Sequence, residues 1–398
     1  MRKSLLLSIL FCFVLFFHLS AVEQTSDGGY VVIGSTQSYT NGVTDFLVYK
    51  LDAAGTKEWR KNFGGENYDN GMFIQQTSDG GYICCGTTQS YVHGSTFYCD
   101  MLVYKLDASG TKEWRKNFGG NECDHAYTIR QTTDGGYILS GETYSYVHGP
   151  YHADSDFLVY KLDAAGTKLW RKNFGGDLNE YDSDIIQTSD GGYALLGSTY
   201  SYSNGDVDFL VYRLDAAGNK LWRKNFGGEQ MDHGMVLQQT SDGGFILAGY
   251  GDSYTNGSTD FLVYRINAAG SKLWRKNFGG TSWDEALGIM QTSDGGYIVG
   301  GQTGSYGTDG DFLAYRLDAS GTKLWRKNFG GEEDDWGTYI VQTSDGGFFF
   351  FGDGDSYVHG GGKDYGDFLA YKLNASGAKE WRKNYGGEES EFTGRGPR

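Results

Sequence analysis

Carboxylates recur along the chain at positions where they could bind a hard cation. Six aspartates each come just before a short apolar segment, and Glu391 takes the same place near the C-terminus. Calcium prefers several oxygen ligands, so a ring of such side chains around one axis could hold it. The alternative, which we favour, is that each carboxylate accepts hydrogen bonds from the amides of its own turn. No cofactor is predicted, and calcium is possible. The six aspartates are Asp69, Asp124, Asp182, Asp232, Asp284 and Asp335.

Aromatic side chains form a second recurring set. A tyrosine follows a serine once in every repeat, and Trp283 and Trp336 stand near the same positions. Exposed aromatic rings can serve as platforms for glycans or proteins, since they combine a large apolar face with a polar edge. The alternative, which we favour for the tyrosines, is that they pack the base of each loop. The tyrosines are Tyr39, Tyr91, Tyr146, Tyr202, Tyr254, Tyr306 and Tyr357.

Cysteines are confined to one short part of the chain, apart from Cys12 near the N-terminus. Four of them cannot form a general disulfide framework, but Cys99 and Cys123 could form one local bridge. Cys123 and His125, with Cys99 nearby, could instead bind a transition metal. The other two cysteines are Cys84 and Cys85.

The N-terminus resembles a targeting segment. Arg2 and Lys3 are followed by the apolar stretch 5–19 and by two small residues, which predicts a signal peptide over residues 1–21. The apolar stretch is shorter than the roughly 20 residues that a membrane helix needs, so we expect no transmembrane segment in the mature chain. The protein is predicted to be secreted, extracellular or at the cell surface, where a disulfide could form.

The elements that must position these residues follow from an internal repeat. The string Gln-Thr-Ser/Thr-Asp-Gly-Gly begins seven times, at intervals of 51 to 56 residues. A period near 50 is typical of stacked supersecondary units. The seven copies begin at Gln24, Gln76, Gln131, Gln187, Gln239, Gln291 and Gln342.

Each repeat predicts four short strands, which in the second copy are 72–77, 82–87, 101–106 and 112–118. These segments are rich in aromatic and β-branched residues, and Gly or Asp separates them. A four-stranded meander repeated seven times predicts an all-β fold, a seven-bladed β-propeller over residues 22–390. Each repeat has one Trp at the start of its fourth strand, which we expect to fill the wedge between blades.

Closure of the ring is less well defined by the repeat. Either the segment 21–25 supplies the first blade's inner strand, or the ring is imperfectly closed. Residues 391–398 are interpreted as a C-terminal tail.

The turns after strands one and three share one face, which we name the turn face. It carries the nearly constant TSDGG and DAAGT turns. The opposite face, the loop face, carries the segments after strands two and four, which vary in length and composition. Variable loops on a rigid frame are where binding usually resides.

The segment "QTSDGGY…DFLVYKLDAAGTKLWRKNFGG" resembles an uncharacterised family of exported repeat proteins with "QTSDGGYIVAG…KLDSNGNIQWxKTYGG" units, over residues 22–390. That resemblance implies export and a β-propeller. "VYKLDAAGTKLW" also resembles the docking repeat of quinoprotein-type (PQQ-like) propellers, "YALDAxTGxxxW", whose Trp packs between blades. Here Gly166 and Thr167 reverse the usual Thr-Gly order, and no residues for a quinone site can be assigned.

The formal net charge of −16 argues against a nucleic-acid partner. We therefore predict a monomeric binding or surface-interaction module that recognises a protein or carbohydrate ligand through the loop face, without catalytic residues. The alternatives are a quinoprotein-like oxidoreductase or glycan-active enzyme, which would need asymmetry between blades, and a purely structural repeat protein.

Overall fold

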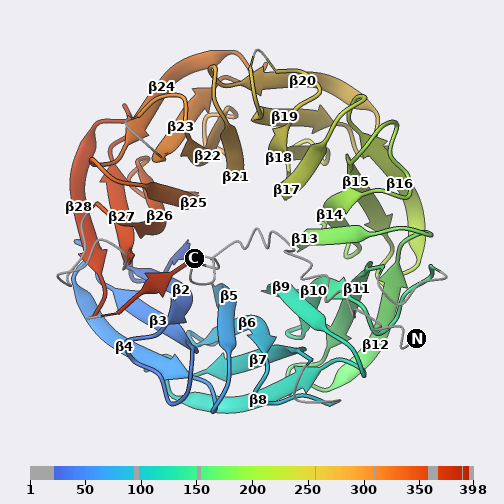
Figure 1. Ribbon diagram of the computed structural model, residues 1–398, viewed down its shortest axis with the longest axis vertical. Coiled ribbons are helices and arrows are strands. Elements are labelled where there is room, and N and C mark those ends of the chain that lie inside the picture. Colours follow the sequence, from blue (N-terminus) through green and yellow to red (C-terminus); the bar gives the residue numbers. More distant parts are fainter. Residues whose placement is uncertain are drawn as a thin grey trace, which may run out of the picture.

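The structure is a ring of seven β-sheets around a central axis, as the repeat predicts. In this computed structural model each sheet, or blade, has four antiparallel strands, and consecutive blades follow one another around the ring (Figure 1). The structure describes residues 22–93, 98–149, 154–255, 257–307, 310–356, 366–387 and 389–393, without the side chains of residues 182, 183 and 338. The predicted signal peptide and Tyr357 lie outside the described residues.

The part of the chain that the structure describes is all-β and contains no helix. It therefore offers no helix long and apolar enough to cross a membrane.

The first strand of each blade lies next to the central axis. In the second repeat it begins at Asp69, three residues before the predicted start, because Asp69 already pairs with Thr88 of the next strand. The corresponding strands begin with an acidic residue in every blade from the second to the seventh. They are β5 (Asp69–Gln76), β9 (Asp124–Gln131), β13 (Glu180–Gln187), β17 (Asp232–Gln239), β21 (Asp284–Gln291) and β25 (Asp335–Gln342).

The second and third strands form the core of each blade, and every residue in them is buried. Neighbouring blades cover both faces, which explains why these strands do not alternate between apolar and polar residues. The second strands are β2 (Tyr30–Thr36), β6 (Tyr82–Thr88), β10 (Tyr137–Thr143), β14 (Tyr193–Thr199), β18 (Phe245–Gly251), β22 (Tyr297–Thr303) and β26 (Phe348–Gly354). The third strands are β3 (Asp45–Leu51), β7 (Asp100–Leu106), β11 (Asp156–Leu162), β15 (Asp208–Leu214), β19 (Asp260–Ile266), β23 (Asp311–Leu317) and β27 (Asp367–Leu373).

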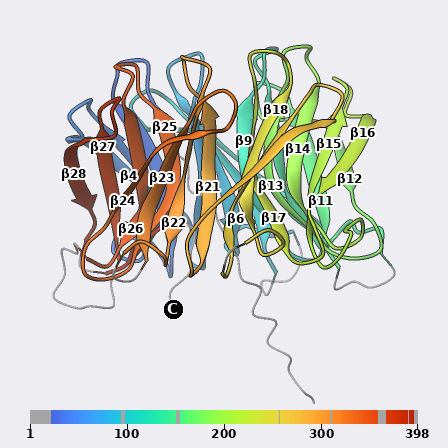
Figure 2. The same ribbon diagram turned by 90° about the horizontal axis from the view of Figure 1, so that it is seen from above.

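The fourth strands form the outer rim, as the edge view in Figure 2 and the axial view in Figure 1 show. Their first two residues are exposed, and the rest are mostly half-buried or exposed. They are β4 (Lys57–Phe63), β8 (Lys112–Phe118), β12 (Lys168–Phe174), β16 (Lys220–Phe226), β20 (Lys272–Phe278), β24 (Lys323–Phe329) and β28 (Lys379–Tyr385).

The recurring Trp fills the wedge between blades, as predicted. Trp59 of the first blade meets Tyr82 of the second edge-on, with 5.7 Å between ring centroids. It also lies against Gly110 in the third turn of the second blade, where φ is +75° and an added Cβ would stand 2.9 Å from the indole. Only glycine adopts this backbone without strain and leaves room for the ring. Each Trp therefore joins its blade to a turn of the next blade.

An ion pair connects the TSDGG turn to the third strand in every blade. Asp27 accepts hydrogen bonds from Gly29 N (2.9 Å) and Thr25 Oγ1 (2.5 Å), and Lys50 Nζ lies 2.8 Å from its other oxygen. Burial alone would raise the pKa of Asp27, but the hydrogen bonds from Lys50 and Thr25 lower it to about 2. The same pair recurs as Lys105–Asp79, Lys161–Asp134, Arg213–Asp190, Arg265–Asp242, Arg316–Asp294 and Lys372–Asp345.

In three blades the cation of this pair forms a second ion pair, with the second residue of the rim strand. In the first blade Lys50 also binds Glu58 at 2.9 Å, and the second and seventh blades repeat this arrangement. Blades four to six have Arg instead of Lys, and Arg213 holds Asp190 with its Nη2 close to both carboxylate oxygens. The guanidinium group of Arg thus binds both oxygens of a single carboxylate. The ammonium group of Lys can bind a second carboxylate at the same time. Blades four to six have Leu where blades one, two and seven have Glu, and the third blade combines Lys161 with Leu169.

The ring is closed by both ends of the chain. β1 (Val22–Gln24) pairs with the first half of β2, and β29 (Glu391–Phe392) pairs with Ser35 and Thr36 at its other end. Figure 1 shows the red β29 beside the blue β2. The inner strand of the first blade is thus made of two separate pieces, and Glu391 and Phe392 belong to the propeller and not to the predicted tail.

Candidate functional site

The acidic residues that begin the inner strands are fully buried. Asp69 accepts hydrogen bonds from Gly65 N at 2.7 Å, from Ser90 Oγ at 2.6 Å and from Thr88 Oγ1. Burial raises its pKa, and repulsion from Asp45 raises it further. All of these bonds come from the protein's own loops, so the geometry agrees with the turn-stabilising alternative. Calcium binding by this set stays a prediction.

One member of the predicted set was assigned to the wrong position. Glu180, not Asp182, begins the inner strand of the fourth blade. Gly176 N donates to Glu180 Oε2 at 2.8 Å, and Thr199 Oγ1 donates to Oε1 at 2.7 Å. Asp182 pairs with Gly197 two residues further along β13. The longer side chain of Glu accepts the same bonds as Asp, so the nearest aspartate in the sequence was a poor guide.

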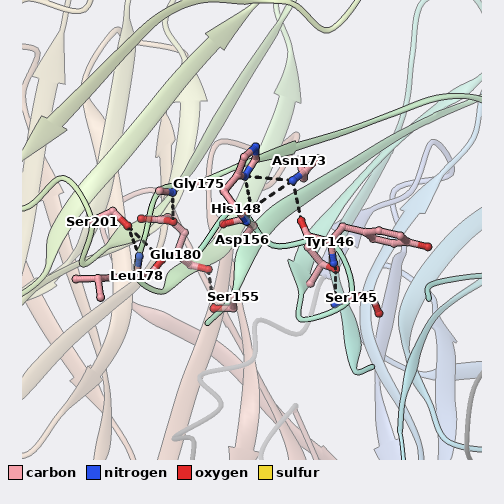
Figure 3. A network of polar contacts seen from close by, with 12 residues as sticks. Ser145, Tyr146, His148, Ser155, Asp156, Asn173, Gly175, Leu178, Glu180 and Ser201 are labelled. Carbon is pink, nitrogen blue, oxygen red and sulfur yellow. Dashed lines mark hydrogen bonds and ion pairs between the residues drawn. The ribbon is translucent and has the colours of Figure 1, made fainter. Parts of the chain in front are cut away.

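Figure 3 shows the polar network that holds the loop bases at the junction of blades three and four. His148 N donates to Asp156 Oδ2 at 3.0 Å, and Asn173 Nδ2 donates to the Tyr146 carbonyl at 2.7 Å. Glu180 begins the neighbouring strand, and Asp156 and Glu180 each have a pKa raised chiefly by burial. Such networks fix the base of each loop and leave its tip free to vary.

The described tyrosines of the predicted aromatic set are half-buried at the base of the loops. The Tyr91 hydroxyl donates to the Gly64 carbonyl at 2.8 Å, and the Arg115 guanidinium lies 3.5 Å from the ring centroid. The Arg that follows the wedge Trp thus stacks on a Tyr of its own blade. The other pairs, at 3.3 to 3.6 Å, are Arg60–Tyr39, Arg171–Tyr146, Arg223–Tyr202, Arg275–Tyr254 and Arg326–Tyr306.

The two additional tryptophans lie together on the loop face. The rings of Trp283 and Trp336 are stacked, with centroids 5.4 Å apart and an angle of 16° between planes. Trp283 immediately precedes β21, and Trp336 is the second residue of β25. Both are half-buried, and Gly304 approaches the Trp283 Nε1 so closely that a Cβ would lie at 2.6 Å. Sequence spacing placed both residues on this face, and the structure brings them into contact.

Four exposed apolar side chains also lie on the loop face. Tyr68 is 44% exposed, Leu178 50%, Met231 40% and Val43 41%. All four lie in segments that follow second or fourth strands. Among the residues that the structure describes, the other large apolar side chains with comparable exposure are the rim residues Leu169, Leu221, Leu273 and Leu324, which are 56 to 58% exposed.

The sulfur atoms of Cys99 and Cys123 are joined in a disulfide, with Cα atoms 4.5 Å apart. Cys99 comes just before β7, and Cys123 just before β9, so both lie at the loop face between the second and third blades. Cys84 and Cys85 are buried inside β6 and take no part in this disulfide. Burial raises the pKa of Cys84 to about 12.

A pocket of about 400 Å³ occupies the end of the central tunnel toward the turn face. Its walls come from the second halves of the inner strands and include Ile74, Leu237, Ile289 and Ile340. Glu23 of β1 is the acidic residue in its lining, and burial raises the pKa of this carboxyl. Its lining also includes Gln75, Gln238 and Arg130, so this half-open pocket offers a small ligand both apolar and polar contacts.

A polar cluster of residues from three blades lies at this pocket. Arg130 Nη2 lies 3.0 Å from Asp184 Oδ1, and Arg130 Nε donates to the Ile185 carbonyl at 3.0 Å. The guanidinium stands 4.7 Å from the Phe73 ring centroid and hydrogen-bonds to Tyr339 of the seventh blade. Burial would lower the pKa of Arg130, but Asp184 and Tyr339 raise it. The cluster thus spans the ring and breaks its symmetry.

Sequence reasoning missed this pocket, although the signal was present. The residue just before each Gln-Thr differs in charge and size between repeats, within an otherwise constant string. A comparison of the residues at that position in the seven repeats would have indicated that the tunnel lining differs from blade to blade. The seven residues are Glu23, Gln75, Arg130, Ile186, Gln238, Met290 and Val341.

Comparison with protein families supports a propeller repeat. Residues 25–58 and 240–272 match the family model described as "Domain of unknown function (DUF5122) beta-propeller". A curated relative, "Regulatory protein FlaEY" of Caulobacter vibrioides, is 26% identical over an alignment of 214 residues, and the match covers 45% of this chain and 22% of that protein. The match thus spans about a fifth of that relative. The finer resemblances to the QTSDGGY units and to quinoprotein repeats stay predictions.

Solved structures share the fold at low sequence identity. Puromycin hydrolase aligns over 94% of this chain and 54% of its own, with a TM-score of 0.58 and 12% identity. The Pan2 WD40 domain of Neurospora crassa aligns over 84% and 86%, with a TM-score of 0.51 and 11% identity. Sqt1 from Chaetomium thermophilum aligns over 94% and 88%, with a TM-score of 0.50 and 13% identity. These likenesses concern the fold alone.

Proposed function

We propose that this protein is an exported β-propeller that binds a partner protein through its loop face. The observation that carries the proposal is the exposure of Tyr68, Leu178, Met231 and Val43 on that face, next to loops that differ in every blade. Large apolar side chains in water favour contact with another surface, because burying them removes apolar area from solvent.

The turn face offers much less for recognition. Its turns are nearly identical in all blades, and their aspartates are held by ion pairs such as Lys50–Asp27. A repeated surface of this kind suits a scaffold. The differences that a specific partner could recognise are concentrated in the loops on the other side.

The aliphatic character of the loop face favours a protein over a glycan. Sugars stack on open aromatic faces, but the Arg115 guanidinium covers one face of Tyr91, and Trp283 and Trp336 cover each other. Leu178 and Met231 suit the side chains of a protein partner better than the hydroxyl-rich surface of a carbohydrate.

A matched pair of variants tests the proposal. Leu178→Ala and Leu221→Ala remove the same side chain at 50% and 58% exposure, one on the loop face and one on the rim. The labelled chain, residues 22–398, is applied to an array of secreted and cell-surface proteins and to a glycan array, with and without calcium. We expect saturable binding to a protein that Leu178→Ala weakens at least several-fold and Leu221→Ala leaves unchanged.

Two outcomes would contradict the proposal. An equal loss of binding affinity in Leu178→Ala and Leu221→Ala would show that the loop face is not the binding surface. Selective binding to glycans alone would replace a protein ligand by a lectin-like role.

The tunnel pocket supports a second candidate function, the binding of a small ligand that carries a positive charge. Among the described residues Asp184 has Arg130 as its ionic partner, whereas Glu23 forms no salt bridge and feels Arg130 only as a more distant charge that lowers its pKa. Its carboxylate accepts a hydrogen bond from Gln76 N. A ligand ammonium would supply the missing charge, and the apolar walls would bind its hydrocarbon part.

Spermidine and n-hexylamine are suitable probes for this pocket, measured by calorimetry against the isosteric variant Glu23→Gln. We expect affinity in the parent chain and its loss in the variant. Binding of either amine with equal affinity to both proteins would exclude Glu23 as the recognition group.

A further inference from the structure

We propose that the dithiol form of this protein binds one thiophilic metal ion through Cys99, Cys123 and His125. The two sulfur atoms and a ring nitrogen of His125 all lie within 4.8 Å of one another. Thiolate and imidazole ligands together select soft or borderline cations such as Zn²⁺ and Cu⁺ over Ca²⁺ or Mg²⁺.

The distance from His125 to Cys99 suits a shared metal. Nε2 lies 3.6 Å from Cys99 Sγ. In a tetrahedral zinc site with Zn–S of about 2.3 Å and Zn–N of about 2.0–2.1 Å, sulfur and nitrogen ligands stand about 3.5 Å apart. Cys99 Sγ also lies 3.8 Å from Nδ1, so the imidazole has to turn before the Nε2 lone pair points at a metal shared with the Cys99 thiolate.

A second contact orients the imidazole. Thr87 Oγ1 lies 3.4 Å from the other ring nitrogen, Nδ1 of His125. If Nδ1 donates its proton to this hydroxyl, the lone pair remains on Nε2, the nitrogen nearer to Cys99. Metal-bound histidines commonly use their second nitrogen in this way, which fixes both the tautomer and the ring orientation.

The repeat provides an internal comparison. His233 occupies in the fifth blade the position that His125 occupies in the third, but Val207 and Met231 stand where the third site has Cys99 and Cys123. Both histidines are in inner strands, one residue after the buried Asp. Two cysteines and a histidine thus occur together where the second blade meets the third, but not at the equivalent place where the fourth blade meets the fifth.

The disulfide and the metal are alternative states of the same sulfur atoms. Dithiothreitol opens the Cys99–Cys123 bond by a two-electron reduction: each sulfur takes up one proton, and the reagent becomes its cyclic disulfide. Metal binding then releases the two thiol protons. His125 is buried and Cys123 is half-buried, so the ion would enter past Cys123.

Cobalt(II) is the probe, because thiolate coordination gives it an intense charge-transfer band and a tetrahedral visible spectrum. The full chain is reduced with dithiothreitol, freed of the reagent without air, and titrated. We expect one equivalent to bind with these bands, and no band in the unreduced protein. Cys99→Ser and Cys123→Ser should abolish the band, and His125→Gln should weaken binding at least tenfold.

Two variants serve as matched controls. Cys84→Ala/Cys85→Ala removes the other two described thiols, and His233→Gln removes the equivalent imidazole; both should bind cobalt as the parent chain does. Near-ultraviolet circular dichroism checks that each variant is folded. Absence of the charge-transfer band in the folded, reduced chain would overturn the proposal, and so would a band that survives in Cys99→Ser/Cys123→Ser.

Discussion

Replacing Arg130 by Met is expected to destabilise the propeller by about 3–5 kcal/mol, because the change leaves a buried carboxylate without its cation. The Asp184 side chain is only 2% exposed, and Arg130 Nη2 lies 3.0 Å from it. The carboxylate keeps hydrogen bonds from the backbone amides of Leu237 and Ile185, and the one from Leu237 N is longer, at 3.3 Å. Methionine keeps most of the aliphatic stem over Phe73, so the variant removes charge more than volume.

The pH dependence separates this mechanism from simple loss of packing. Burial raises the pKa of Asp184, and Arg130 opposes that shift, so the variant raises the pKa further. Between the unfolded pKa of about 3.9 and the raised folded value, the folded state holds more protons than the unfolded state. Stability therefore falls as pH rises through the folded pKa. The cost of Arg130→Met should be full above that pKa and shrink toward pH 4.

The assay is urea unfolding followed by tryptophan fluorescence, with Arg130→Met/Asp184→Leu as the second variant. Removing both charges leaves no unpaired ion, so the double variant should recover most of the lost free energy of unfolding. The reasoning would be refuted if Arg130→Met cost less than about 1 kcal/mol, or if the double variant were as unstable as the single one at every pH.

Three further variants test the turns and the rim. Gly110→Ala places a Cβ at a φ of +75° and 2.9 Å from Trp59, whereas Gly135→Ala meets a similar φ of +80° with nothing within 4 Å. Backbone strain should lower the free energy of unfolding of both variants by about 1–2 kcal/mol, and overpacking should lower that of Gly110→Ala by a further 1–3 kcal/mol. Urea unfolding measures both values. Equal losses would show that the wedge tolerates the methyl group. Leu169→Glu offers Lys161 the second carboxylate that the Lys blades one, two and seven possess, and should raise the free energy of unfolding by less than about 1 kcal/mol in a salt-dependent way. A gain that persists in 1 M salt would contradict an ionic origin.

The repeat made most of the fold predictable. Strand periodicity, the constant turns and the single Trp per unit require local information only, and the structure agrees with them at β6 to β8 to within one residue. The inner strand was less predictable, because Asp69 looks like a loop residue until its pairing with Thr88 is known. The position of Glu180 was missed for a related reason, since its role depends on hydrogen bonds from Gly176 and Thr199 and not on residue type.

The sequence by itself determined the number of blades, the strand order and the residues at each wedge, because these follow from local patterns repeated along the chain. Only the tertiary structure decided how the ring closes and what lies in its tunnel. β1 and β29 share one strand position although the whole propeller separates them in sequence, and Arg130 meets Asp184 and Tyr339 from other blades. Such contacts depend on the closure of seven blades into a circle, a condition that no single repeat contains.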